Sequence, residues 1–368
     1  MRRMSPNKQA FAAVAFLLIA LSSSKSPLHP LGVTALSSRV PDRSAEASGN
    51  MKDERLILPT SGIEAQVISC SPTNVKTDKP PLIFLHGSFH GAWCWQEHYI
   101  PYFVDQGFPC IALSWRGTGG TPAGEGIKKI KILEHCQDLQ GLLDLLPTIL
   151  GRDDCPKPIL VSHSMAGIYV MKFLEESWKE GKKPRDLFAG IALLCSTPPS
   201  GNGKATMRVL KRSLRDAYKI TVGFVLKKVN TDATICRLCF FGGNPKVLED
   251  GTIDDLGVSD DDIARYQSNF ERDSQAVLDV VDLSKNLPSK LVDSGGQSPF
   301  IKDLPPSIVI GAADDFVVDK IGVEETCRYF GLDQPVFVDS PHDVMLTQKW
   351  QNGANALLTW IEKEVLDQ

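Results

Sequence analysis

Short apolar runs alternate with longer amphipathic segments along most of the chain. The runs predict buried strands at residues 82–85, 110–113, 159–161, 190–195, 307–310 and 336–338. Apolar residues at helical spacing predict helices over residues 92–103, 130–146, 165–178, 320–329 and 353–365. Ahead of them, the alternation from Arg55 to Cys70 around Ser61-Gly62 predicts an edge hairpin. The order of strands and helices implies an α/β fold, with a mostly parallel sheet and helices on both faces.

The alternation stops between Thr197 and about Leu304. Pro198-Pro199 opens this segment, helical stretches follow, and no part of it has a convincing strand pattern. We therefore interpret residues 198–304 as a helical cap inserted between two strands, and residues 51–368 as the one domain that contains it.

The first fifty residues differ in composition from the rest of the chain. Three basic residues precede an apolar run of twelve residues, Ala10 to Leu21, which is the pattern of a secretory signal peptide and is short for a bilayer span. The Ser-rich stretch that follows has no acidic residue before Asp42, as in transit peptides. We expect residues 1–50 to be a presequence for the secretory pathway, with onward transport to a plastid left open. The alternative is an uncleaved signal anchor.

Charge and cysteine content narrow the function. A net charge of −4 argues against a general nucleic-acid-binding protein. The nine cysteines are irregularly spaced, and the lone pair Cys236 and Cys239 has no partner residues nearby for a zinc site. We expect mostly reduced thiols, with Cys110 and Cys195 serving as small hydrophobic residues in strands. No metal and no stable membrane span in the mature chain are expected.

The segment from Ile159 to Ile168 has the pattern of a nucleophile elbow. A strand runs directly into a helix here, and Ser164 stands at the turn between them. The residues two positions away, Ser162 and Ala166, are small, as the sharp turn requires, although neither is the glycine of the G-x-S-x-G pattern. Ser164 is therefore the candidate nucleophile. The alternative is an ordinary helix N-cap.

A serine nucleophile needs a base, and in this order of elements the base follows the serine. His342 is the only histidine downstream of Ser164. It comes just after the predicted strand at residues 336–338, where a loop can bring its imidazole over the serine. His342 is therefore the candidate base.

The base in turn needs an orienting carboxylate after the strand at residues 307–310. Asp314 and Asp315 stand side by side there, and neighbours in an extended loop face opposite ways. We choose Asp315 and keep Asp314 as the alternative. The third carboxylate, Asp319, is better explained as the N-cap of the next helix.

Acyl transfer also needs two N–H donors for the oxyanion. The N–H of Met165 follows the nucleophile and opens a helix, so it has no partner within that helix. The loop after His86-Gly87 supplies the second candidate, the N–H of Ser88. All these residues follow the carboxyl ends of predicted strands, where ligands bind in open α/β sheets.

At this point the residues resemble a known family. The segment from His86 to Trp95, HGSFHGAWCW, resembles the oxyanion segment of the methylesterase and hydroxynitrile-lyase group of α/β-hydrolases. Arg116 to Gly120 resembles the R-G-x-G loop of the wider superfamily. The resemblance implies a capped, single-domain serine hydrolase in which Ser164, Asp315 and His342 form a triad and Ser88 and Met165 form the oxyanion hole. Its cap has no match, so the substrate stays open.

The leading interpretation is a serine hydrolase that cleaves a carboxylic ester, either a small ester or a lipid, through an acyl-enzyme. It needs no metal or organic cofactor, and its partner is the small-molecule substrate rather than nucleic acid. One alternative is a lyase of the hydroxynitrile-lyase kind, which uses the same Ser and His without an acyl-enzyme. The other is a hydrolase-fold receptor for a small molecule.

Overall fold

The computed structural model describes residues 50–73, 78–243, 246–247, 253–254 and 258–367. All of them lie within one compact unit, Ser44–Gln368. Residues 1–49 of the expected presequence lie outside the described residues. None of the described helices is long and apolar enough to cross a bilayer.

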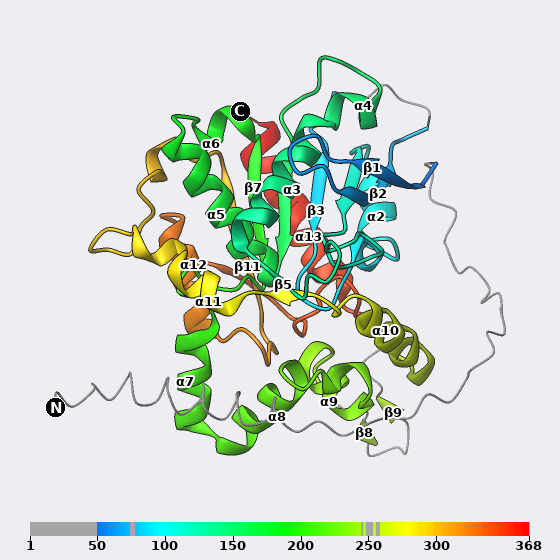
Figure 1. The fold of residues 1–368 in the computed structure, drawn as a ribbon, viewed down its shortest axis with the longest axis vertical. Helices are drawn as coiled ribbons and strands as arrows, with labels where there is room; N and C mark the ends of the chain where they lie inside the picture. The colour runs from blue at the N-terminus through cyan, green and yellow to red at the C-terminus, as the bar shows by residue number, and fades with distance from the viewer. Residues whose placement is uncertain (1–49, 74–77, 244–245, 248–252, 255–257, 368) are drawn as a thin grey trace. The chain divides into compact units, whose positions relative to one another are not determined.

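An eight-stranded sheet runs through this unit (Figure 1). Its strands are, in spatial order, β1 (Lys52–Ile57), β2 (Glu64–Cys70), β4 (Cys110–Leu113), β3 (Leu82–Leu85), β6 (Ile159–His163), β7 (Gly190–Leu194), β11 (Ser307–Ala312) and β12 (Val336–Val338). β1 and β2 are antiparallel, as are β2 and β4, and every other neighbouring pair is parallel. The predicted α/β class, the edge hairpin and the six following strands are thereby confirmed.

Helices cover both faces of the sheet because the central strands are buried on both faces. Adjacent side chains such as Ile83 and Phe84 in β3 are fully buried in two different cores. One core contains the apolar faces of α3 (Ile132–Asp144), α5 (Met165–Lys179) and α12 (Lys320–Tyr329). The other contains those of α2 (Tyr99–Asp105) and α13 (Trp350–Trp360), which continues as a π-helical turn at Ile361–Leu366.

Two predicted helices are shorter than expected. The segment at residues 92–103 divides into a 3₁₀ turn, Ala92–Trp95, and α2. In this turn the Trp95 side chain is buried in the core, while the indole N–H of Trp93 donates to Asp273. The segment at residues 130–146 begins as a strand and ends early, since Pro147 stands in the first turn of a separate helix, α4 (Leu146–Leu150). A short α6 (Pro184–Leu187) precedes β7.

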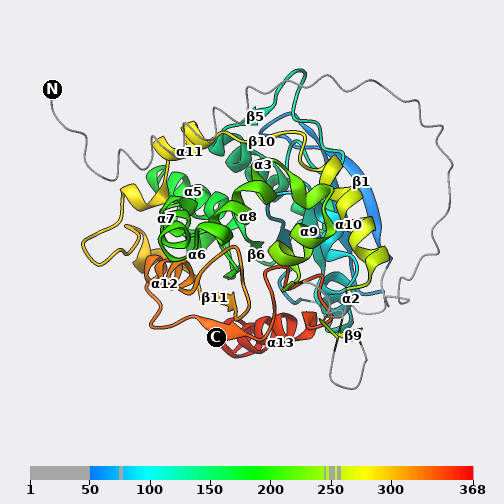
Figure 2. The same cartoon turned by 90° about the horizontal axis from the view of Figure 1, so that it is seen from below.

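The segment between β7 and β11 is mainly helical, with α7 (Asn202–Arg212), α8 (Leu214–Phe224), α9 (Ala233–Phe240), α10 (Asp260–Arg272) and α11 (Val280–Lys285). Figures 1 and 2 show α7, α8 and α9 below the sheet, across its lower edge. The expectation of no strand in this segment is wrong. β10 (Val277–Leu278) pairs with β5 (Lys129–Ile130), and β8 (Lys246–Val247) pairs with β9 (Ile253–Asp254). Strands of two residues are too short to show a period in the sequence.

Candidate active site

Ser164 occupies a strained turn between β6 and α5. Its φ of 52° and ψ of −119° lie outside the regions that non-glycine residues ordinarily adopt. The N–H of Ser164 donates to the carbonyl of Leu194 at 3.0 Å, which holds the turn against β7. A methyl group on Gly87 would lie 2.8 Å from Cβ of Ser164, so the neighbouring loop fits only without a side chain there. Because Ser164 makes no capping hydrogen bond, it is not an ordinary N-cap.

Three side chains from separate loops meet at this turn. The hydroxyl of Ser164 lies 3.0 Å from Nε2 of His342, and Nδ1–H of His342 donates to Oδ2 of Asp315 at 2.8 Å. His342 and Asp315 are both buried. The structure therefore brings together the serine, histidine and carboxylate that the sequence singled out, within hydrogen-bonding distance and in the order that activates a serine nucleophile.

The choice between the adjacent carboxylates follows from the loop after β11. Oδ1 of Asp315 accepts the N–H groups of Val317 and Val318 at 2.7 and 2.8 Å, which fixes the carboxylate with its other oxygen toward His342. Asp314 is exposed. Asp319 caps α12 through Gly322 N–H at 2.9 Å, as expected.

The electrostatics around His342 favour its charged form. Burial alone would lower the pKa of His342, but the Asp315 carboxylate, its hydrogen bond, and the nearby Asp343 together raise that pKa above the usual value. A base with a raised pKa accepts a proton more readily from a hydroxyl group. The pair is therefore suited to take the proton of Ser164.

The predicted oxyanion donors flank the serine. Met165 begins α5 directly after Ser164, and Ser88 lies in the loop after β3, one residue beyond Gly87. Within the described residues, neither N–H donates to a protein acceptor. Phe89 has a φ of 70°, so the loop that carries Ser88 is itself strained. Two unpaired N–H donors next to a nucleophile are suited to receive a developing negative charge.

Aromatic side chains cover the site from the helical segment. The Phe240 ring lies 6.2 Å from the His342 ring, with an angle of 30° between the two ring planes. Phe224 lies 5.6 Å from both Phe240 and Phe89. These rings form an apolar surface beside His342 that suits a hydrophobic part of a substrate.

A second polar cluster, which the sequence interpretation did not identify, lies behind His342. Nε2 of His90 lies 2.9 Å from Asp343, and Nε2–H of His163 donates to the His342 carbonyl at 3.0 Å. Nδ1 of His90 lies 2.8 Å from the Ser88 carbonyl. The available signal was the position of Asp343 next to His342 and of a second histidine in the 86–95 segment. Neither position belongs to a periodic pattern.

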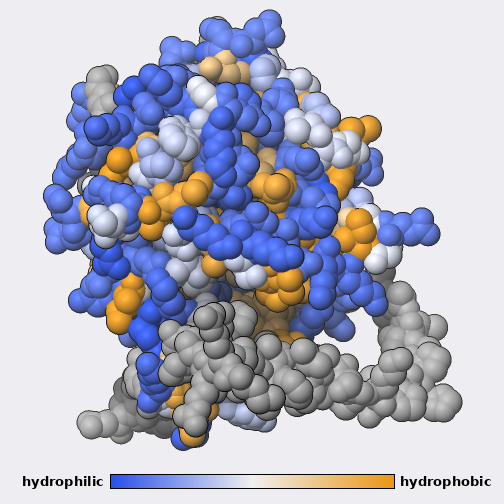
Figure 3. All heavy atoms as spheres, turned by 60° about the vertical axis from the view of Figure 1, so that its left-hand side comes forward, coloured by the Kyte–Doolittle hydropathy of each residue, from blue (hydrophilic) through white to orange (hydrophobic). Residues whose placement is uncertain are grey.

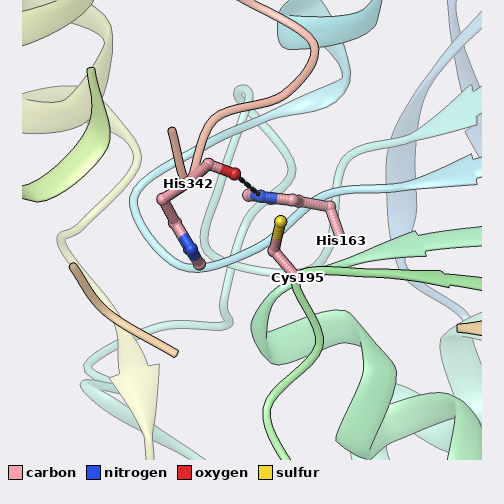
Figure 4. A group of neighbouring side chains, drawn as sticks. All are labelled: His163, Cys195 and His342. Carbon is pink, nitrogen blue, oxygen red and sulfur yellow. Dashed lines mark hydrogen bonds between the residues drawn. The ribbon is translucent and has the colours of Figure 1, made fainter. Parts of the chain in front are cut away.

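Cys195 completes a tight group with His163 and His342 (Figure 4). Side-chain ligand atoms of the three lie within 4.8 Å of one another. Burial, followed by the nearby Asp315, raises the pKa of the Cys195 thiol well above its usual value, which disfavours the thiolate that binds metals. Both ring nitrogens of His342 are also engaged by Ser164 and Asp315. These residues therefore do not fit a resident metal. All nine cysteines are free thiols.

Two conspicuous residues of the predicted loops have structural contacts instead. Burial lowers the pKa of His86 to about 4, and its neutral ring accepts the N–H of Trp115 at 3.1 Å, which joins the ends of β3 and β4. The guanidinium of Arg116 donates two hydrogen bonds to the Asp138 carboxylate, at 2.6 and 2.7 Å, and a third to the Glu134 carboxylate. Both residues hold the loops around the site in place.

The chain matches the model of the alpha/beta hydrolase family over residues 82–350. Among curated proteins, it is 37% identical over 97 residues to Methylesterase 4 of Arabidopsis thaliana. That alignment covers 25% of this chain and 33% of the relative, so the chain spans about a third of the length of the curated relative that it matches.

Solved structures show the same fold at low identity. An epoxide hydrolase mutant from Solanum tuberosum has a TM-score of 0.59 at 16% identity, covering 85% of this chain and 100% of that chain. The 2-hydroxy-6-oxo-6-phenylhexa-2,4-dienoate hydrolase from Rhodococcus sp. strain RHA1 has a TM-score of 0.57 at 16% identity, covering 85% and 99%. A carboxylesterase structure from Nitrososphaera gargenis has a TM-score of 0.56 at 15% identity, covering 85% and 100%.

Proposed function

Because the chain belongs to the alpha/beta hydrolase family, we propose that it is a serine hydrolase that cleaves a carboxylic ester through an acyl-enzyme. The observation that carries the proposal is the unbroken line of contacts from Ser164 to His342 at 3.0 Å and from His342 to Asp315 at 2.8 Å. The strained turn at Ser164 supports it, because such strain persists where a function requires an exposed nucleophile.

In the first half of the reaction, Nε2 of His342 takes the hydroxyl proton of Ser164 as the serine oxygen attacks the ester carbonyl carbon. Asp315 stabilises the imidazolium that forms. The carbonyl oxygen becomes an oxyanion, and the N–H groups of Ser88 and Met165 are placed to bind it. The intermediate then expels the alcohol, which leaves with the proton from His342.

In the second half, water attacks the acyl-enzyme. His342 takes a proton from that water and returns it to the serine oxygen as the acid leaves. No step in this cycle needs a metal or an organic cofactor.

Two features, the serine at the elbow and the aromatic rings near His342, indicate which class of substrate the chain would cleave. Epoxide hydrolases and dehalogenases of this fold use a carboxylate at the elbow, whereas this chain has Ser164. The apolar roof of Phe89, Phe224 and Phe240 favours an ester with a hydrophobic acyl or alcohol group. The partial likeness to a methylesterase also favours ester cleavage.

A fluorophosphonate probe tests the proposal, because it labels only an activated serine. We expect labelling of the wild-type chain at Ser164, found by peptide mass spectrometry, with turnover of a short p-nitrophenyl ester. Ser164→Ala is the matched control and should lose both. Absence of labelling in the folded wild-type protein would favour a receptor, and turnover of a cyanohydrin without ester hydrolysis would favour a lyase.

A further inference from the structure

The segment from Asn202 to Lys228 differs in charge from the rest of the molecule. It contains eight basic residues and one acidic residue, Asp216, in a chain whose net charge is −4. The basic residues are Lys204, Arg208, Lys211, Arg212, Arg215, Lys219, Lys227 and Lys228. Arg208 is paired with Asp319, but Lys211, Arg215 and Lys228 are exposed. The basic residues lie on α7, on α8 and just after α8, where Lys227 donates to the Ser274 carbonyl. Lys204 on α7 lies 3.8 Å from Glu325.

The same segment exposes large apolar side chains. Leu214 is 74% exposed and Tyr218 is 68% exposed, and Val225 and Leu226 follow at 48% and 41%. Leu214 and Tyr218 on α8 and Val225, its C-cap residue, recur at helical spacing, so they form a stripe along one face of the helix and its C-terminal end. On the face drawn in Figure 3, hydrophilic residues predominate and apolar ones are scattered among them. Exposed apolar side chains that gather on one face of a helix mark a candidate contact surface.

Another face of α8 packs toward the site. Ala217 and Gly223 are buried there, and the Phe224 ring packs 5.6 Å from Phe240, which in turn lies over His342. One helix therefore carries both the exposed apolar stripe and part of the apolar roof.

We propose that α8 and its flanks dock on the surface of a bilayer that contains anionic lipids. Leu214, Tyr218 and Val225 would enter the boundary between headgroups and acyl chains, while Lys211, Arg215 and Lys219 contact the lipid phosphates. Charge complementarity selects this partner, because an apolar stripe bordered by several basic side chains and one acid matches a negatively charged apolar interface. Docking goes beyond ester hydrolysis, and it would place the roof of the site at the lipid surface.

Hydrogen exchange with mass spectrometry tests the docking locally. The full-length Ser164→Ala chain is mixed with vesicles of phosphatidylcholine alone or with phosphatidylglycerol added, so no turnover is needed and failure of the hydrolase proposal leaves the result readable. We expect peptides of residues 202–228 to gain protection with the anionic vesicles only, while peptides of β1 do not change. No protection, or equal protection by neutral vesicles, would overturn the proposal.

Vesicle sedimentation with matched variants gives the second measurement. Each basic residue near an anionic surface strengthens partitioning about fivefold, so Lys211→Gln, Arg215→Gln and Lys219→Gln together should weaken it on the order of a hundredfold. Leu214→Ser with Tyr218→Ser should also weaken it. The control is Lys52→Gln with Ile57→Ser, an exposed pair on β1, which should bind as the wild type does. Unchanged binding by the α8 variants would overturn the proposal, as would a concentration-dependent dimer that these variants abolish.

Discussion

Nε2 of His90 lies 2.9 Å from Oδ2 of Asp343, and both side chains are buried directly behind His342. Nδ1 of His90 faces the Ser88 carbonyl at 2.8 Å, and a carbonyl can only accept a hydrogen bond. The His90 ring therefore bridges the Ser88 carbonyl and the Asp343 carboxylate. Burial alone would raise the pKa of Asp343. The neighbouring His90 and its hydrogen bond, together with His163 and His342, lower that pKa overall, which favours the ionised carboxylate. This pair joins the loop of Ser88 to the loop of His342.

The first prediction concerns the stability that this pair provides. His90→Ala leaves the Asp343 carboxylate buried without a partner, and we expect the free energy of unfolding to fall by about 3–5 kcal/mol. Urea unfolding near neutral pH measures it. The matched control is His90→Ala with Asp343→Asn, which removes the charge as well and should recover part of the loss. A loss below about 1 kcal/mol in the single variant would contradict a buried carboxylate that depends on His90.

The same pair predicts how stability depends on pH. The pKa of Asp343 is lower in the folded state than the usual value. Its contribution is therefore fully present above about pH 4, the value for an unfolded aspartate, and is lost as the pH falls through the lower folded pKa. We expect the stability difference between the wild type and Asp343→Asn to shrink over that acidic range. A constant difference would contradict the shift.

The next prediction concerns catalysis. His342 acts as a base only when neutral, and Asp343 helps to raise its pKa. Asp343→Asn removes that charge, so the pKa of His342 should fall and the acidic limb of the kcat/KM profile should move to lower pH. The control is Asp339→Asn, an exposed acid of the same loop that is hydrogen-bonded to Lys349. An acidic limb that stays in place in the Asp343 variant would show that this carboxylate does not act on His342.

The serine and the histidine should act as one unit. Ser164→Ala and His342→Ala should each reduce ester turnover to near background, and the double variant should lose little more, because each needs the other for the proton transfer. Steady-state rates of the three variants on one p-nitrophenyl ester measure this. Losses that add in the double variant would contradict a shared mechanism.

The sequence predicted the sheet and the candidate residues because both depend on local patterns. Wholly apolar runs mark β3, β4 and β6, and the polar residues that follow them meet at one edge of a parallel sheet. Ser164, Asp315 and His342 could therefore be selected by their place after a strand and by the scarcity of downstream histidines.

The remaining features depend on contacts between distant parts of the chain. The β5–β10 pair joins residues about 150 positions apart through only two residues on each side, so no period marks it. The His90–Asp343 pair spans 253 positions. The outward stripe of α8 was also missed, because an apolar face in a sequence does not show whether it meets a core or solvent.

The last prediction separates the two adjacent carboxylates. Nδ1–H of His342 donates to Asp315 at 2.8 Å, whereas Asp314 is exposed and engages the loop of Ser340 through its backbone N–H at 3.2 Å. Asp315→Asn keeps the shape but offers an amide that favours the wrong tautomer of His342, and turnover should fall on the order of 10⁴-fold. Asp314→Asn leaves the backbone contact in place and should change turnover little.

Steady-state rates of both variants on one ester decide between the carboxylates, and thermal unfolding of each shows that the fold is retained. Asp315 also accepts two backbone N–H groups, and the amide oxygen of an asparagine can still accept them. Asp315→Asn therefore tests the catalytic effect without loss of the loop structure, which Asp315→Ala would not do. The reverse ranking of the two variants would assign the acid to Asp314. Near-wild-type turnover in both would remove the carboxylate from the mechanism, since a base without an orienting acid would then suffice.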